Sequence, residues 1–178
     1  MNQINLNRLL CLLCLWLSAP AMALDSDRNK PLKIVADTAL IDEKSGMAVY
    51  TGSVVLIQGT LKIVADKLSI QTIEGKVDKV MADGAPALFS QVPEPNQSEV
   101  IAKAKRIDYM VIDQKLLLKR SASIVQEDNI FRGEEILYEI QSQRLQAQGE
   151  TKDHKPGDIK RRVEMILPAA AEPTPEKK

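Results

Sequence analysis

The sequence has few of the residues that usually build catalytic or metal sites. Its 178 residues include two cysteines, one histidine and one tryptophan, and aromatic side chains make up 3% of the chain. Cys11, Cys14 and the tryptophan all lie in the N-terminal segment that ends at Leu17. The rest of the chain therefore has no thiol for a disulfide, for a thiolate zinc site or for nucleophilic catalysis.

The N-terminal residues form a targeting signal. Arg8 precedes an apolar run over 9–17, and Ala21-Met22-Ala23 has the small-x-small pattern of a cleavage site. The run is about half the length that crosses a bilayer, which favours a secretory signal peptide over 1–23 rather than a retained anchor. We therefore expect an exported protein that begins near residue 24.

An internal repeat is the strongest signal in the rest of the chain. Residues 32–37, LKIVAD, recur letter for letter over 61–66, and looser copies follow from Ala104 and Gly133. A fixed period of this kind indicates repeated supersecondary units. The interval between the second and third copies is longer than the other two intervals. A Pro-rich segment over 93–97, which we predict to be a loop, accounts for the extra residues.

Apolar and polar residues alternate within each unit, as they do in strands with one buried face. Turn signals separate these runs, so we predict antiparallel strands of about five to seven residues. Residues 100–111 and 136–145 also fit a helical period, but the repeat places them in the slots of the 32–37 string, which favours strands. Residues 163–167 could add a last strand, and 168–178 form a tail that we expect to be disordered.

Catalysis has little support. His154 lies in a charged stretch, where a solvated surface histidine is the favoured interpretation. The chain has no Gly-x-Ser-x-Gly segment and no glycine-rich phosphate loop. Asp37 and Asp66 could pair as in a glycoside hydrolase, but their equivalent repeat positions favour hydrogen-bonding roles at strand ends. Because basic and acidic residues number 24 each, we expect no nucleic-acid partner.

Six motifs are spread along the chain: Pro31-Leu32-x-Ile34-x-x-Asp37, Tyr50-Thr51-Gly52-x-Val54, Gln58-Gly59-Thr60-Leu61-Lys62-Ile63-x-Ala65-Asp66, Gly84-x-Pro86-Ala87-x-Phe89, Ala104-x-x-Ile107-x-Tyr109 and Gly133-x-x-Ile136-x-Tyr138. Together they resemble the OstA-like family of lipopolysaccharide export. The likeness covers about residues 31–149. The chain departs from the family at Lys119-Arg120-Ser121-Ala122, where a Thr-Gly-Asn-Ala-like segment is expected, and this affects the local turn geometry.

The resemblance implies an all-β fold: an elongated, open antiparallel β-jellyroll over residues 24–167. It implies a non-enzymatic periplasmic carrier, without a cofactor, that holds the lipid A part of lipopolysaccharide in an apolar groove. The implied partners are lipopolysaccharide, the inner-membrane complex protein LptC, the outer-membrane barrel protein LptD, and further copies of the chain joined head to tail.

Matching motifs select Leu32, Ile34, Phe89, Tyr109 and Val111 as lipid-contacting residues. A plain core position is the alternative for each: the two interpretations are balanced for Leu32 and Ile34, and the groove is favoured for Phe89 and Tyr109. Lys76 and Lys79 could meet lipid phosphates, although a solvated hairpin is the favoured interpretation.

Two other functions stay open. The apolar segments 53–57 and 116–118 place hydrophobic residues on both faces of their strands, which fits an interface as well as a groove. A structural β-repeat scaffold without lipid cargo is therefore the main alternative, and a carbohydrate hydrolase that uses Asp37 and Asp66 is the third.

Overall fold

The computed structural model describes residues 27–94, 97–150 and 162–168. The predicted signal peptide, His154 and residues 169–178 lie outside this part. A short 3-10 helix, η2 (Asp27–Asn29), precedes the strands β1 (Lys33–Val35), β2 (Thr38–Asp42), β3 (Met47–Gln58), β4 (Leu61–Ile73), β5 (Lys76–Gln91), β6 (Val100–Met110), β7 (Lys115–Gln126), β8 (Asn129–Glu139), β9 (Arg144–Gln148) and β10 (Glu164–Ile166). In the described part, no helix is long and apolar enough to cross a membrane.

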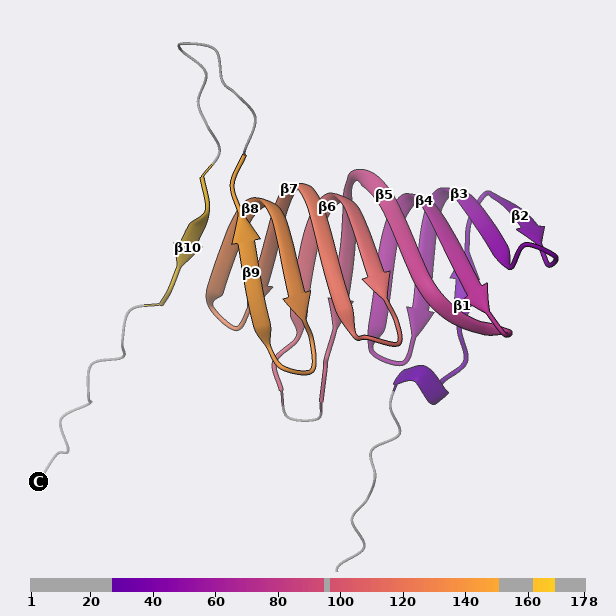
Figure 1. Cartoon of the computed structure of the whole chain (residues 1–178), viewed down its shortest axis with the longest axis horizontal. Coiled ribbons are helices and arrows are strands. Elements are labelled where there is room, and N and C mark those ends of the chain that lie inside the picture. The colour runs from indigo at the N-terminus through magenta and orange to yellow at the C-terminus, as the bar shows by residue number, and fades with distance from the viewer. Residues whose placement is uncertain (1–26, 95–96, 151–161, 169–178) are drawn as a thin grey trace, which may run out of the picture.

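The strands form one antiparallel sheet that follows the chain. Its order is β1-β3-β4-β5-β6-β7-β8-β10, with β2 beside β3 and β9 beside β8. Figure 1 shows this row from β1 and β2 on the right to β9 and β10 on the left. The all-β prediction is confirmed, and so are the strand over 100–110 and the strand within 163–167. The segment 136–145 is strand as predicted except over 140–143, where a turn separates β8 from β9.

The strands are longer than predicted. β3 to β8 contain 11 to 16 residues each, and the pairing register breaks inside them, for example between Thr51 and Val54 and between Asp83 and Ala87. The prediction of strands of five to seven residues was therefore wrong. Asp83-Gly84 has the composition of a turn signal but lies inside β5. Extra residues within a strand produce a bulge that bends it without reversing the chain.

These bulges divide the sheet into two leaves. The first leaf consists of β1, β10 and the segments 54–58, 61–65, 87–91, 100–104, 122–126 and 129–133. The second leaf consists of β2, β9 and the segments 47–51, 67–73, 76–83, 106–110, 115–119 and 135–139. The long strands bend over at the top of Figure 1 and connect the leaves along that bend, so the molecule is an open β-jellyroll.

The core lies between the leaves. The predicted alternation holds within each half-strand: Val54 and Leu56 are buried in the first leaf, and Leu116 and Leu118 in the second, while Ile57 is exposed. Small side chains gather near the bend, including Ala65, Ala82, Ala87, Ala104 and Ala122. The centre of the interior is therefore filled by the protein's own aliphatic side chains.

Two pairs of left-handed residues mark the bend. Gly52 (φ 84) and Ser53 (φ 44) occupy it in β3, and Arg120 (φ 66) and Ser121 (φ 57) occupy the equivalent place in β7. A Cβ on Gly52 would collide with the Asp37 carboxylate, which explains the need for glycine there. Asp66 lies exposed inside β4, so the prediction that it ends a strand was wrong.

Candidate functional site

The hairpin turns of the two leaves face each other along the side opposite the bend, which we call the mouth. Two cavities of about 370 and 540 Å³ open there, at the N-terminal half of the sheet. Both are lined by residues of the two leaves, and they share Arg28, Gln58, Leu61, Tyr109 and Val111. The mouth is therefore an apolar trough with a polar rim, partly divided at Arg28.

Four of the five predicted lipid-contacting residues lie at or behind the mouth. Tyr109 and Val111 line both cavities, and Leu32, which is 39% exposed, lines the larger one. Phe89 is buried behind Tyr109, with the ring centroids 5.5 Å apart. Ile34 is half-buried in β1 and packs against the core at the N-terminal edge.

The two predicted lysines lie in different surroundings. Lys76 lines the larger cavity, at the rim of the second leaf. The Lys79 ammonium pairs with the Asp108 carboxylate at 3.4 Å, and Arg106 donates to the same carboxylate at 3.0 Å. Asp108 lies between the inward residues Ile107 and Tyr109, so this ion cluster belongs to the other face of the strand. Of the two lysines, Lys76 is the one at the cavity.

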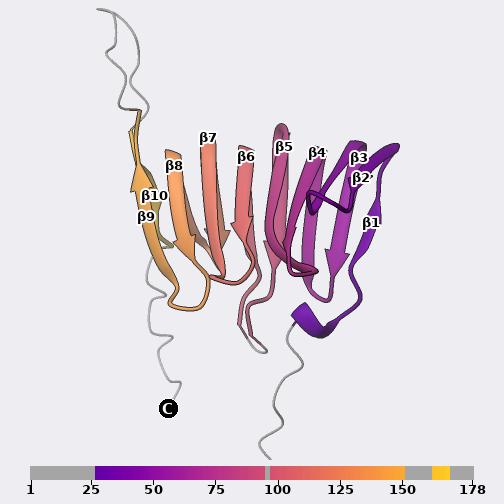
Figure 2. The ribbon, with the colours of Figure 1, turned by 45° about the vertical axis from the view of Figure 1, so that its right-hand side comes forward.

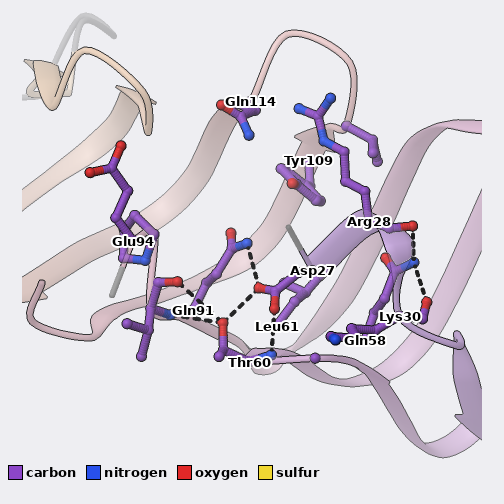
Figure 3. A pocket seen from close by; sticks show the side chains of 14 residues that line it. Asp27, Arg28, Lys30, Gln58, Thr60, Leu61, Gln91, Glu94, Tyr109 and Gln114 are labelled. Carbon is purple, nitrogen blue, oxygen red and sulfur yellow. Dashed lines mark hydrogen bonds between the residues drawn. The ribbon is translucent and has the colours of Figure 1, made fainter. Parts of the chain in front are cut away.

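The N-terminal turn η2 lies across the mouth. Figure 2 shows η2 at the lower end of the strands, and Figure 3 shows Asp27 against Thr60 and Gln91. The Gln58 side-chain amide donates to the carbonyl oxygens of Arg28 (3.3 Å) and Lys30 (3.1 Å). On the other side, the Arg28 guanidinium donates to the Ile112 carbonyl of the second leaf at 3.4 Å.

The Tyr109 hydroxyl reports the environment of the mouth. Its burial raises its pKa above the ordinary value of 10.0, while the nearby Arg28 lowers this pKa in part and Asp27 raises it. Tyr109 is only 3% exposed. The ring is therefore a neutral, amphipathic part of the wall, with its apolar face toward the core and its hydroxyl near two charged residues.

Sequence reasoning missed the polar rim. Asp27, Arg28, Gln58, Thr60 and Gln91 line the smaller cavity. Gln58-Gly59-Thr60 was noted as part of a family motif but not as part of a binding site, and Asp27 precedes every predicted strand.

Within the ranges that the structure describes, no group of three histidine, cysteine or acidic side chains could hold a metal ion.

Both ends of the sheet carry exposed apolar side chains. At the N-terminal edge, Leu40 and Ile41 of β2 are 72% and 60% exposed. At the C-terminal edge, Met165 and Ile166 of β10 are also exposed, as is Leu167 just after it. The strands β1, β2, β9 and β10 each pair with one neighbour only among the described residues, so their outer edges are available for a further strand.

The bent, open-sided antiparallel sheet defines the chain as a β-jellyroll protein. The family described as LptA/(LptD N-terminal domain) LPS transport protein matches residues 33–144, and the chain belongs to this family. The resemblance to the OstA-like family seen in the sequence is thereby confirmed.

Known relatives carry names from the same transport system. The lipopolysaccharide export system protein LptH of Pseudomonas aeruginosa is 34% identical over 84% of this chain and 86% of its own length. The protein LptA of Escherichia coli K12, of the same export system, is 32% identical over 82% of this chain and 80% of its own. The crystal structure of LptH, described as a periplasmic component of the lipopolysaccharide transport device, superposes with a TM-score of 0.72 at 32% identity, over 81% of this chain and 99% of that one.

Proposed function

We propose that this chain is a non-enzymatic periplasmic carrier that shelters the lipid A acyl chains of lipopolysaccharide between its two leaves. The observation that carries the proposal is the mouth, where two cavities open along one side: Tyr109 and Val111 line both, Leu32 lines the larger one, and polar residues such as Arg28 and Gln58 form the rim. The open side leaves room for a sugar head group in water. The names of the relatives support the same cargo.

The physical need for such a trough is large. Each buried methylene contributes about 0.8 kcal/mol, so a dozen-carbon acyl chain costs roughly 10 kcal/mol to expose to water. Several chains on one lipid therefore have to stay covered throughout an aqueous crossing.

Acyl chains can enter the filled interior only if the leaves part. Every strand pairing joins segments of the same leaf, and the leaves are connected by the strands that cross the bend. Opening at the mouth thus breaks apolar contacts between the leaves and a few side-chain hydrogen bonds, such as the one that the Tyr138 hydroxyl donates to the Gln126 side-chain oxygen at 3.2 Å. It leaves the ladder hydrogen bonds intact. Lipid chains then replace aliphatic contacts with contacts of the same kind.

End-to-end association completes the proposal. The first strands of one copy, β1 and β2, would pair with the last strands of the next, β9 and β10, by β-augmentation. Head-to-tail contacts of this type form open chains, which can bridge from LptC at the inner membrane to LptD at the outer membrane.

Depletion of the protein from its host tests the function. We expect newly made lipopolysaccharide to accumulate at the inner membrane, and a plasmid copy of the chain to restore export. A Val111→Glu copy should fail to restore export, because it places a charge in the mouth. Val125→Glu is the matched control, since Val125 is also half-buried but alternates with the inward Ile124.

The filled interior favours one alternative, a β-repeat scaffold without lipid cargo. A scaffold predicts that depletion leaves lipopolysaccharide export unchanged while the envelope loses mechanical integrity. It also predicts that both valine variants behave alike.

A further inference from the structure

Three donors of the first leaf surround the Asp27 carboxylate. The Thr60 backbone N–H donates at 2.8 Å, the Thr60 hydroxyl at 2.6 Å, and the Gln91 side-chain amide at 2.9 Å. A Cβ on Gly59 would collide with the same carboxylate, so glycine (φ 61) makes the approach possible. We call Thr60 and Gln91 the anion cradle. Its geometry suits any oxyanion, because backbone, hydroxyl and amide donors converge on one place.

Asp27 does not satisfy the whole cradle. Gln91 is 9% exposed, and its side-chain oxygen is buried without a hydrogen-bond partner in the described part of the structure. Because the amide nitrogen donates to Asp27, the amide oxygen lies on the side turned away from it, as Figure 3 shows. A buried, unpaired acceptor is uncommon in proteins and is satisfied when an O–H or N–H group arrives.

The cradle lies where a head group would leave the trough. Thr60 and Gln91 line the smaller cavity together with Tyr109, and Arg28 lines both cavities. An amphiphile with its chains behind Tyr109 would present its polar groups at this rim. The turn η2 now occupies that space, held by Gln58 and by Asp27.

We propose that the anion cradle binds an anionic oxygen of the lipid head group, a phosphate or the carboxylate of an acidic sugar. Asp27 fills the cradle until such a ligand displaces it, and a hydroxyl or amide N–H of the ligand then pairs with the Gln91 oxygen. This inference rests on the proposed function, because it names the polar subsite of the same trough. The turn is then a self-ligand that covers the mouth of the empty carrier.

Binding of purified protein to lipid A, to dephosphorylated lipid A and to complete lipopolysaccharide tests the inference. Asp27→Ala should bind phosphorylated lipid A about ten-fold more tightly than the unaltered chain, as expected if Asp27 occupies the cradle about nine-tenths of the time. Asp66→Ala is the matched control, since this exposed carboxylate lies at the bend, away from the mouth. It should bind like the unaltered chain.

A second set of variants separates the cradle from general charge. Adding Thr60→Val and Gln91→Met to Asp27→Ala should abolish the gain, whereas a gain caused only by losing a negative charge would persist. Dephosphorylated lipid A should show no gain if phosphate is the ligand. A gain seen only with complete lipopolysaccharide would identify the sugar carboxylate.

The inference is overturned if Asp27→Ala binds as the unaltered chain does, or if its gain survives the loss of both cradle side chains. Either result would leave the carrier function intact, because the unaltered chain would still bind lipid. Absence of lipid binding in every variant, with the thermal unfolding midpoint unchanged, would instead contradict the proposed function.

Discussion

The rings of Phe89 and Tyr109 meet edge to face, with centroids 5.5 Å apart and planes at 64°. Phe89 belongs to the first leaf and Tyr109 to the second, so the contact connects the two leaves directly behind the mouth. A carrier whose leaves part to admit acyl chains has to break this contact. The pair therefore serves as a measure of how strongly the empty trough is held closed.

A double-mutant cycle measures this contact. We expect Phe89→Leu and Tyr109→Leu to couple by about 0.5–1.5 kcal/mol in the free energy of unfolding, the range for edge-to-face aromatic pairs. Urea denaturation of the single and double variants gives the coupling. The control cycle joins Phe89→Leu with Tyr138→Leu, because the Phe89 ring contacts Tyr109 and not Tyr138. Equal coupling in both cycles would contradict a specific contact between the leaves.

Alkaline pH should destabilise the fold through Tyr109. Burial raises the folded-state pKa of its hydroxyl above 10.0. Below pH 10 both states keep the proton, and the stability is complete. As the pH rises above 10, the unfolded chain loses the proton while the folded chain retains it, so stability falls by up to about 1.4 kcal/mol per pH unit. The fall ends once the folded-state pKa is passed.

Thermal or urea unfolding between pH 9 and 12 should show this decline, and Tyr109→Phe should reduce it. Tyr138, whose pKa burial also raises, accounts for a second part that Tyr138→Phe removes. An alkaline decline of the same steepness in both variants and in the unaltered chain would contradict the assignment.

The backbone of Arg120 is strained, because this residue occupies the place in the bend of β7 that Gly52 occupies in β3. Its φ of 66° lies in the left-handed region, which costs a residue with a Cβ roughly 1–2 kcal/mol. We expect Arg120→Gly to raise the free energy of unfolding by about 1 kcal/mol, after the loss of its exposed ion pair with Asp83 and the extra entropy of glycine in the unfolded chain. Lys119→Gly, in the regular part of β7, should instead lower it. If both variants lowered the free energy of unfolding by a similar amount, the bend would carry no strain.

The repeat made the strands predictable, whereas the bend was not. The two copies of the repeat, Leu32–Asp37 and Leu61–Asp66, predicted where strands lie and which of their side chains are buried. Both copies also belong to the motifs that resemble the family. Gly52-Ser53 and Gly84 have the same composition as hairpin turns, and only the strands on either side decide between a turn and a bulge. That decision depends on pairing with residues far away in the sequence, which a local pattern does not contain.

The apolar half of the site was predictable and the polar half was not. Tyr109 stands in a family motif and Val111 follows it by two residues, and the structure places both at the mouth. Asp27 and Gln91 are 64 positions apart and belong to no motif, yet they are hydrogen-bonded. A hydrogen bond of this kind depends on the fold that brings the two residues together.

The exposed edge of β2 should control self-association. Leu40, 72% exposed on this edge strand, would be covered when the last strand of another copy pairs with it. Leu40→Asp should weaken head-to-tail association about ten-fold or more, as judged by sedimentation velocity over a range of concentrations. Ile73→Asp is the control, because Ile73 is 52% exposed at the β4–β5 hairpin, away from both edges. Equal effects of the two variants would argue against edge pairing.

The most direct test places a photo-crosslinking amino acid in living cells at Tyr109 and, separately, at Leu117. Tyr109 faces the interior at the mouth, while Leu117 lies between the inward residues Leu116 and Leu118 and so faces away from the interior. The account predicts that irradiation attaches lipopolysaccharide to the protein at Tyr109 and not at Leu117. Adducts at Leu117 alone, or at neither position in a folded protein, would contradict transport of lipid between the two leaves.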